Sequence, residues 1–234
     1  MSLGRTAPVD HIQELIQHHR RFVTPQRFEK MQTVLANRTR YITVALEDIY
    51  QSHNASAVLR SCDGFGIQDA YIIEGRNPFK PNKKIELGTS QWLTLHRFKK
   101  SARCTEAAIE EMRTRGYRIV ATSPHGKDVE LENFDLSKGP AAFFFGNELD
   151  GLSSAMKAQA DEFVKIPMFG FVESFNISVS CALVLHHLVH QLQRQVNDWQ
   201  LKPNEKQEIL LDWLRKSNKN WRSIESYMGA HKEE

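Results

Sequence analysis

The chain has 234 residues, of which 41% are hydrophobic, and its formal net charge is +3. This size and composition exclude global disorder and fit one α/β domain with helical additions, because the chain has enough apolar residues for a sizeable core. It contains no run of about 18 apolar residues that could cross a membrane, and its first residues lack the apolar centre of a signal peptide. We therefore expect a cytoplasmic protein that does not bind membranes.

The charge is spread unevenly along the chain. Lys and Arg outnumber Asp and Glu by seven to three in residues 1–40 and by seven to one in residues 76–100. In residues 41–75 the balance is reversed, with five acidic residues and one basic residue. Two basic segments are consistent with a polyanionic partner. The alternative is that these side chains form a solvated helix face and a surface loop.

Near the N-terminus, apolar residues recur at the spacing of one helical face. The residues on this predicted face are Ile12, Leu15, Ile16 and Phe22. A second helix is expected to begin with Thr24 as its N-cap and Pro25 in its first turn. We expect residues 1–40 to form a basic helical extension.

Residues 41–200 alternate between short apolar runs and helical patterns. The apolar runs predict strands at 41–46, 70–74, 117–123, 141–146 and 163–168. Helices are expected after Asn54, from about Thr105, from about Ser153 and from near Asn176, and residues 76–100 are expected to contain a basic loop. Short continuous apolar strands separated by helices predict a mostly parallel sheet with helices on both faces.

Residues 201–234 predict a second helical extension that begins at Pro203. Its apolar residues at helical spacing include Ile209, Leu210, Trp213 and Leu214. We expect these helices to pack on the main domain or on a second subunit.

Ligands of open α/β sheets bind at the carboxyl ends of the strands, and three loops predicted there carry unusual residues. The first is HNASAVLRSCDGFG, residues 53–66. Asn54 could belong to a site or simply cap a helix. Arg60 lies among apolar neighbours in a helix that we expect to be buried, so its guanidinium would need an anionic partner.

The second loop is FFFGNELDGLS, residues 143–153, which follows a strand of aromatic residues. Gly146 and Gly151 would let the backbone turn sharply and approach a ligand, next to the polar Asn147 and Glu148. The alternative is an ordinary Gly-rich turn that leads to a helix capped by Ser153.

The third loop lies within IPMFGFVESFNISVSCALVLHHL, residues 166–188. Its polar residues between a strand and a helix are Glu173, Ser174, Asn176, Ser178 and Ser180. One helix cap requires one such residue. The additional polar residues predict a ligand-binding surface at a helix N-terminus, where a carboxylate or phosphate group is favoured.

Several common sites are absent from the sequence. It has no GxxxxGK[ST], no GxGxxG after the first strand and no HExxH, which argues against nucleoside triphosphate, dinucleotide and zinc sites of those kinds. The three cysteines are far apart and form no CxxC pair, so we expect buried free thiols and no metal site. They are Cys62, Cys104 and Cys181.

The segments NASAVLR (54–60), FFFGNELDG (143–151) and IPMFGFVESFNISVSCALVLHHL (166–188) resemble motifs 1, 2 and 3 of the SpoU/TrmH family, RNA 2'-O-methyltransferases of the SPOUT class. The resemblance covers the chain from about residue 41 to 195. It implies S-adenosyl-L-methionine as cofactor, a homodimer and a C-terminal deep trefoil knot, in which the last strand and helix thread through an earlier loop. Knots are otherwise almost absent from proteins.

The resemblance also implies roles for individual residues. The catalytic residues would be Arg60, Asn54, Glu148, Ser174 and Asn176. The cofactor pocket would contain Ala121, Thr122, Ser123, Gly146, Asn147, Gly151, Ile166, Met168, Phe175 and Asn176. Arg60 would either help to remove the proton from a ribose 2'-OH or bind the adjoining phosphate. A guanidinium keeps its proton in proteins, and both roles stay open.

Residues 27–67 resemble the tRNA guanosine-18 methyltransferases, which implies methylation of the ribose of guanosine 18 in the D-loop of tRNA. Ribosomal RNA is the alternative substrate, and an inactive knotted RNA-binding protein is the alternative outside enzymes. The expected RNA contacts are Arg20, Arg21, Arg27, Lys30, Lys83 and Lys84.

Overall fold

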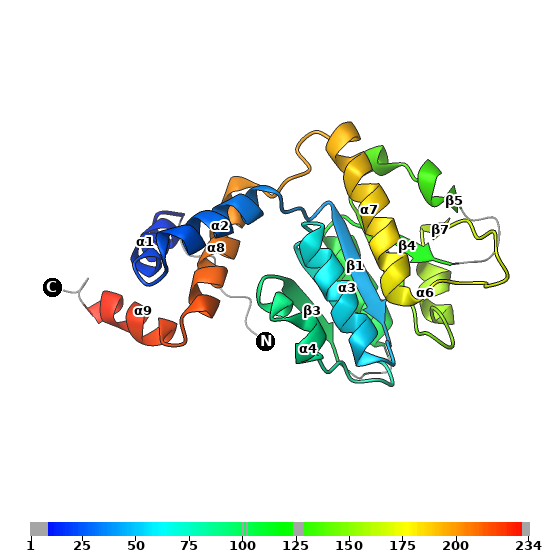
Figure 1. Cartoon of the computed structure of the whole chain (residues 1–234), viewed down its shortest axis with the longest axis horizontal. Coiled ribbons are helices and arrows are strands. Elements are labelled where there is room, and N and C mark those ends of the chain that lie inside the picture. The colour runs from blue at the N-terminus through cyan, green and yellow to red at the C-terminus, as the bar shows by residue number, and fades with distance from the viewer. Residues whose placement is uncertain (1–8, 100, 102, 124–128, 231–234) are drawn as a thin grey trace. The chain divides into compact units, whose positions relative to one another are not determined.

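The computed structural model describes residues 9–99, 101, 103–123 and 129–230 (Figure 1). The chain divides into two compact units. One is Thr39–Trp199, and the other combines Met1–Arg38 with Gln200–Glu234. The sequence predicted two separate extensions, one at each end of the chain. In the structure these two segments belong to a single unit.

A parallel sheet forms the centre of the Thr39–Trp199 unit. In the described residues it has seven strands in the order β3-β2-β1-β6-β4-β7-β5, and every neighbouring pair is parallel. The strands are β1 (Ile42–Glu47), β2 (Asp69–Ile73), β3 (Thr94–Phe98), β4 (Arg118–Thr122), β5 (Val129–Glu130), β6 (Ala141–Phe145) and β7 (Glu162–Lys165). Every residue of β1 and β6 is buried, which explains the continuous apolar sequence of β6 and the mostly apolar sequence of β1.

The five predicted strands are confirmed, but the expectation of a basic loop across residues 76–100 is wrong. This segment contains helix α4 (Lys83–Glu86), a 3-10 turn at Thr89–Gln91 and the edge strand β3. The sequence of β3, TLHRF, is only partly buried. It has neither a continuous apolar run nor a regular alternation, so the usual strand signal is missing.

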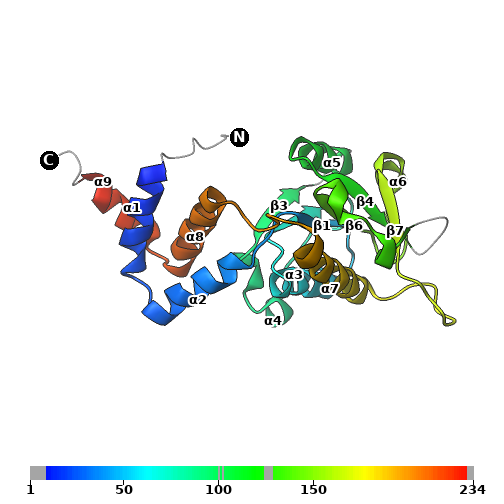
Figure 2. The ribbon, with the colours of Figure 1, turned by 90° about the horizontal axis from the view of Figure 1, so that it is seen from above.

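Helices cover both faces of the sheet (Figure 2). On one face lie α3 (Ser52–Gly64) and α7 (Ile177–Gln195), and on the other lie α5 (Cys104–Thr114) and α6 (Ser154–Gln159). Successive residues of a strand point to opposite faces. Accordingly, Ile42, Val44 and Leu46 of β1 pack with α3 and α7, while Ala45 joins the core beneath α5.

The strand order changes direction beside β1. From β1 the chain proceeds outward through β2 and β3, whereas β6, β4 and β7 lie on the other side of β1. Because β4, β6 and β7 are parallel, their carboxyl ends lie at one edge of the sheet, where ligands of such sheets bind. The threading of the chain that would make a trefoil knot stays a prediction.

The second unit consists, in its described part, of four helices. They are α1 (Val9–Arg20), α2 (Pro25–Ala36), α8 (Pro203–Ser217) and α9 (Trp221–Ala230). Helix α8 packs against α1 and α2, so the terminal helices bind the N-terminal ones, which was not expected. The predicted start of α2 is confirmed, because the Thr24 hydroxyl accepts a hydrogen bond from the Arg27 N–H at 3.2 Å.

Polar contacts also join the two ends of the chain within this unit. The buried ring of His19 lies 2.8 Å from Glu225, whose carboxylate also accepts a hydrogen bond from Arg215 at 2.7 Å. Burial opposes ionisation, but the bonds to Arg215 and His19 lower the pKa of Glu225 overall. Phe22 was expected on the apolar face of α1, which is wrong, since it lies beyond the helix end and is 52% exposed.

Candidate functional site

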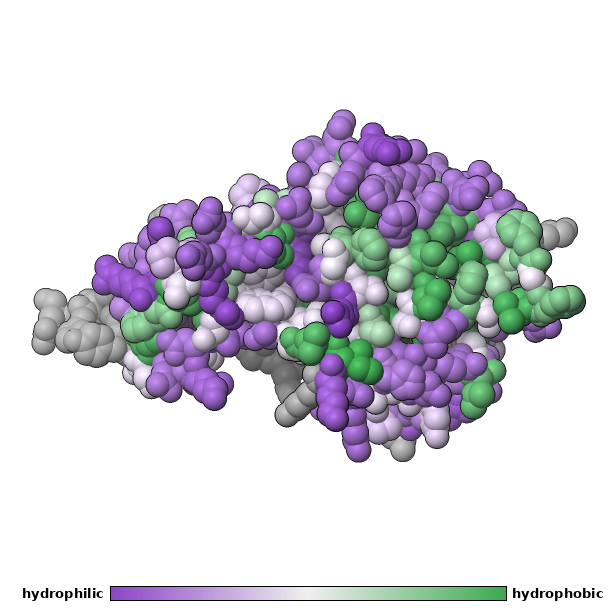
Figure 3. Space-filling model, in the orientation of Figure 1, coloured by the Kyte–Doolittle hydropathy of each residue, from purple (hydrophilic) through white to green (hydrophobic). Residues whose placement is uncertain are grey.

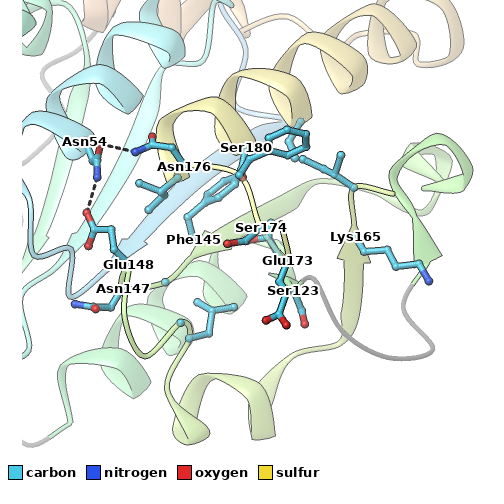
Figure 4. A pocket seen from close by; sticks show the side chains of 18 of the residues that line it. Asn54, Ser123, Phe145, Asn147, Glu148, Lys165, Glu173, Ser174, Asn176 and Ser180 are labelled. Carbon is cyan, nitrogen blue, oxygen red and sulfur yellow. Dashed lines mark hydrogen bonds between the residues drawn. The ribbon is translucent and has the colours of Figure 1, made fainter. Parts of the chain in front are cut away.

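A cavity of about 560 Å³ lies at the carboxyl ends of β4, β6 and β7, beside the first turn of α7 (Figure 4). Its walls come from the loops after these three strands and from the segment that leads into α7. Sites for small molecules and cofactors commonly have volumes of about 300–1,000 Å³. The cavity therefore has the size of a cofactor site, at the edge where the sheet topology predicts one.

A chain of hydrogen bonds joins the three polar loops at this cavity. Asn54 at the start of α3 donates from Nδ2 to Oε1 of Glu148, at 2.7 Å. Asn176 donates from Nδ2 to Oδ1 of the same Asn54, at 3.2 Å (Figure 4). Asn54 is 2% exposed, and a buried amide without partners would be costly. These hydrogen bonds connect Asn54 to Glu148 and to Asn176, which lie 94 and 122 positions further along the chain.

The Glu148 carboxylate also binds the backbone that precedes α3. It accepts hydrogen bonds from the N–H groups of Tyr50 at 3.1 Å and Gln51 at 3.4 Å. These two backbone donors lie near a helix N-terminus, where N–H groups need acceptors and a negative charge is favourable. Glu148 therefore acts as the cap that the side chain of Gln51, the residue preceding α3, does not provide.

The two glycines of the second loop are required by its tight closure. The backbone N–H and C=O of Asn147 both pair with Gly151, at 3.0 and 2.9 Å. A Cβ atom at Gly146 would lie 2.2 Å from the carbonyl carbon of Gly151, and Gly151 itself has φ +67°. Ser153 caps α6 by accepting a hydrogen bond from the N–H of Met156 at 3.1 Å. The turn is thus tightly constrained, and it also forms one wall of the cavity.

Asn176 has two functions at the third loop. Its side-chain oxygen caps α7 by accepting hydrogen bonds from the N–H of Ser178 at 2.9 Å and from the Ser178 hydroxyl at 2.6 Å. Its Nδ2 group is the donor to Asn54 described above. The capping role and the site role were alternatives in the sequence, and the structure combines them in one side chain.

Most of the predicted cofactor residues line the cavity. They are Thr122, Ser123, Gly146, Asn147, Gly151, Ile166, Met168, Phe175 and Asn176. Ala121 does not, because it is fully buried within β4. Of the predicted catalytic residues, Asn54, Glu148, Ser174 and Asn176 also line it.

Arg60 lies outside this group. It is exposed on α3, it does not line the cavity, and it forms no hydrogen bond or ion pair with the described residues. The expectation of a buried guanidinium with an anionic partner is wrong. Its neighbours Val58, Leu59 and Cys62 are buried on the inner side of α3, and the helical period turns residue 60 outward.

Two charged residues of the cavity lining were not predicted, Lys157 and Lys165. Glu173, which the third loop predicted as part of a binding surface, also lines the cavity. Lys165 is the last residue of β7, so its position at a strand end was a usable signal. Glu47 was missed altogether: its buried carboxylate accepts hydrogen bonds from the N–H and hydroxyl of Ser153 at 2.8 and 2.7 Å.

The predicted RNA contacts are surface residues wherever their side chains are described. Arg20, Arg27 and Lys30 are exposed on α1 and α2, and Arg21 is exposed between them. Lys84 is exposed on α4, which begins at Lys83. The Arg20 guanidinium lies 4.8 Å from the centre of the Phe28 ring, which leaves its outer edge open to a phosphate.

Among the described helices, none combines the length and apolar character needed to cross a bilayer. The described residues also contain no cluster of three or more His, Cys, Asp or Glu side chains suited to a metal ion. All three cysteines are free and buried, as predicted. Burial, and then contact with the Cys62 thiol, raises the pKa of Cys181, so this thiol is not an activated nucleophile.

Comparison with known sequences places the three loops in a known context. Residues 41–186 match the model of the SpoU rRNA Methylase family. The tRNA (guanosine(18)-2'-O)-methyltransferase of Borreliella burgdorferi is 39% identical, over 90% of this chain and 94% of that protein. The enzyme of the same name from Thermus thermophilus is 32% identical, over 82% of this chain and 98% of that protein.

Solved structures agree with these sequence matches. The Aquifex aeolicus TrmH/SpoU tRNA modifying enzyme has a TM-score of 0.73 and 27% identity, and the match covers 82% of this chain and 96% of that one. The SpoU methyltransferase AviRb of Streptomyces viridochromogenes, solved with its cofactor AdoMet, has a TM-score of 0.58 and 25% identity. That match covers 68% of this chain and 64% of AviRb.

Proposed function

The chain belongs to the SpoU rRNA Methylase family, and on this premise we propose that it methylates the ribose 2'-OH of guanosine 18 in tRNA, with S-adenosylmethionine as methyl donor. The choice of tRNA as substrate rests on the length of the match to relatives named for this activity. The match to the Borreliella burgdorferi enzyme covers 90% of this chain. The family description mentions rRNA, but its model covers residues 41–186 alone and omits the helical unit.

The cavity suits a molecule that combines an adenine ring, a ribose and a charged amino-acid end. Leu152, Val164 and Ile166 supply apolar surface, while Ser123 and Glu173 supply polar groups. The backbone of the second loop lacks side chains at two positions, because a Cβ atom at Gly146 would collide with the loop itself and Gly151 has φ +67°, and so it can approach a ligand closely. We assign cofactor binding to the nine predicted residues that line the cavity.

When bound, S-adenosylmethionine supplies an electrophilic methyl group on a sulfonium sulfur. The chain's contribution is to hold the attacking oxygen in line with that methyl group, and such positioning is a major source of catalysis. A carboxylate offers about four lone-pair sites, and Glu148 accepts three hydrogen bonds from the described residues. The remaining site can accept the hydrogen of the ribose 2'-OH, and Ser174 and Asn176 also line the cavity.

Arg60 has a different part in this scheme. An exposed guanidinium retains its charge, so removal of a proton by Arg60 is the weaker of its two predicted roles. We propose that it binds the phosphate next to the reacting ribose. In each unit further basic residues are proposed to contact the tRNA backbone, those of α1 and α2 in one and those of α4 in the other, which gives RNA binding a strong dependence on salt.

Replacing Arg60 with alanine is expected to lower kcat/KM for tRNA by about 100-fold, since a lost phosphate contact misplaces the ribose. Cofactor affinity should stay close to that of the wild type, because Arg60 lies outside the cavity lining. Steady-state kinetics and calorimetry with the cofactor measure the two effects. Arg60→Lys, which keeps a point charge, should recover part of the loss. Loss of cofactor binding in Arg60→Ala would contradict the assignment.

We further propose that the enzyme is a homodimer in the cytoplasm, the compartment where tRNA is modified. Apolar side chains gather over α7 and the segment before it (Figure 3). The exposed ones are Phe169, Phe171, Val172, Phe175, Val179 and Leu183. Contiguous exposed apolar surface on one face typically marks a protein interface.

The dimer can be tested on the outer face of α7. Val179 and Leu183 are 44% and 41% exposed and lie one helical turn apart. Changing both to glutamate should convert the dimer to a monomer, because two charges would be buried without partners at the interface. Light scattering coupled to size-exclusion chromatography measures the mass. Gln193→Glu, on an exposed residue near the end of α7, is the matched control and should stay dimeric.

The proposed activity is tested with labelled S-adenosylmethionine and an unmodified tRNA transcript. We expect one 2'-O-methylguanosine per tRNA, at position 18, and no transfer to a tRNA that carries 2'-deoxyguanosine there. Label found only in ribosomal RNA would assign the alternative substrate. Label on a base instead of a ribose would overturn the proposed reaction.

A further inference from the structure

Asp48, the first residue after β1, has an unusual backbone conformation. Its φ is +54°, in the left-handed region that side chains other than Asn, Asp and Gly rarely adopt. Such conformations cost free energy and persist where surrounding contacts enforce them. The contacts of Asp48 therefore identify what this conformation achieves.

The loop after β2 holds the Asp48 carboxylate. Oδ1 accepts hydrogen bonds from the backbone N–H groups of Arg76 at 2.6 Å and Asn77 at 2.7 Å, and Oδ2 accepts one from Arg76 Nε at 3.0 Å. A Cβ atom at Gly75 would lie 3.3 Å from this carboxyl group, so glycine permits the close approach. Hydrogen bonds to an ionised carboxylate are stronger than neutral ones, which makes this a firm attachment.

The backbone carbonyl of Asp48 in turn holds the second loop of the cavity. It accepts a hydrogen bond from Asn147 Nδ2 at 2.7 Å. The other side-chain atom of Asn147, Oδ1, accepts one from the N–H of Leu149 at 2.8 Å, and its backbone pairs with Gly151. Every polar group of Asn147 thus has a hydrogen-bond partner. Glu148 lies between Asn147 and Leu149, whose hydrogen bonds hold the backbone on both sides of it.

A second connection runs to the same loop but is weaker. Arg76 Nη2 lies 2.5 Å from Asp150, and the bonds to Asp150 and then Asp48 raise the pKa of Arg76. The side chains of Arg76 and Asp150 are 70% and 62% exposed, and ion pairs so exposed contribute little to stability. Asp150, whose side chain also lines the cavity, therefore provides a comparison for the loop attachment alone, with a much smaller expected effect on loop protection.

We propose that Asp48 is a positioning residue for the methyl transfer, which keeps Asn147 and Glu148 at the cavity by tying their loop to the loop after β2. Asp48 does not line the cavity, so it acts through these two residues. The inference rests on the proposed function for its kinetic consequence. The hydrogen-bonded connection itself does not depend on that function.

The test compares Asp48→Gly, Asp48→Asn and Asp150→Ala. Glycine accepts the positive φ but removes the carboxylate, so kcat should fall by on the order of 100-fold, while the KM for tRNA changes little. Asparagine tolerates the conformation and keeps an oxygen for both backbone donors, so it should restore most of kcat. Asp150→Ala, which removes only the exposed ion pair to Arg76, should leave the exchange protection of residues 146–153 as in the wild type.

Hydrogen–deuterium exchange supplies a readout that is independent of activity. In Asp48→Gly, amides of residues 146–153 should exchange faster, while those of β4 and α5 remain as in the wild type. The inference is overturned if this variant retains kcat and loop protection, if Asp48→Asn is as impaired as Asp48→Gly, or if protection is lost throughout the unit, which would indicate a role in folding. A wild-type enzyme that does not methylate tRNA would refute the proposed function, and the exchange result would still decide the connection.

Discussion

Replacing Glu148 with alanine is expected to lower kcat for methyl transfer by about a thousandfold, the scale of losing a catalytic acid–base group. The change removes the acceptor of three hydrogen bonds, from Asn54 and the N–H groups of Tyr50 and Gln51. The buried Asn54 NH₂ group would keep only its longer hydrogen bond to Gln51 Oε1, at 3.3 Å, and the link from Asn176 to Asn54 would no longer extend to residue 148. Single-turnover kinetics with unmodified tRNA measure the effect on the chemical step.

Glu148→Gln separates charge from shape. An amide of the same length would turn its NH₂ group toward at least one N–H donor, so we expect it to be nearly as inactive as the alanine variant. Glu132→Gln, at an exposed carboxylate that does not line the cavity, should keep nearly full activity. If Glu148→Ala retained a third of the wild-type kcat, the carboxylate would be a helix cap and no more.

Gly146→Ala is expected to abolish detectable cofactor binding. The new Cβ atom would lie 2.2 Å from the carbonyl carbon and 2.5 Å from the carbonyl oxygen of Gly151, and 2.3 Å from the N atom of Leu152. These neighbours are backbone atoms, so the loop has to move to relieve the clash. We expect a loss of about 1–3 kcal/mol in the free energy of unfolding, as for overpacking. Calorimetry with S-adenosylmethionine and thermal unfolding measure both effects.

Gly170→Ala is the matched control for this variant. A Cβ atom at Gly170 would have no atom within 4 Å, and this glycine follows the cavity residue Met168 by two positions. It should bind the cofactor as the wild type does. Normal cofactor affinity in Gly146→Ala would mean that the loop can open without affecting the site, which would remove the main support for placing the cofactor beside it.

Much of the sheet could be predicted from the sequence, and the reason is its burial. AAFFF at β6 and ITVALE at β1 lie between two layers of helices, so they are mostly apolar and lack the polar alternation of a half-exposed strand. β3 failed as a prediction because its position at the sheet edge leaves it partly exposed. The pairing of α8 with α1 and α2 also escaped, since an apolar helical face does not specify its partner.

For the site, the sequence could predict which residues take part but not which of them contact one another. The family motifs named Asn54, Glu148 and Asn176, but only the folded chain shows that one carboxylate and two amides form a single connected chain. Arg60 shows the opposite error, because apolar neighbours in sequence do not bury a residue on the outer side of a helix. Asp48 gave no signal at all, since its importance lies in a backbone angle and a carbonyl oxygen.

The helical unit built from both chain ends has a consequence for biosynthesis. His19 and Glu225, which meet in this unit, are 206 residues apart in the chain. At translation rates of about 5–20 residues per second, the ribosome needs on the order of ten to forty seconds to make the second after the first. During that time α8 has not been synthesised, so the apolar sides of α1 and α2, including Leu15, Phe28 and Met31, lack the helix that packs against them. A nascent chain stalled before residue 203 should therefore depend on chaperones that shield the N-terminal helices.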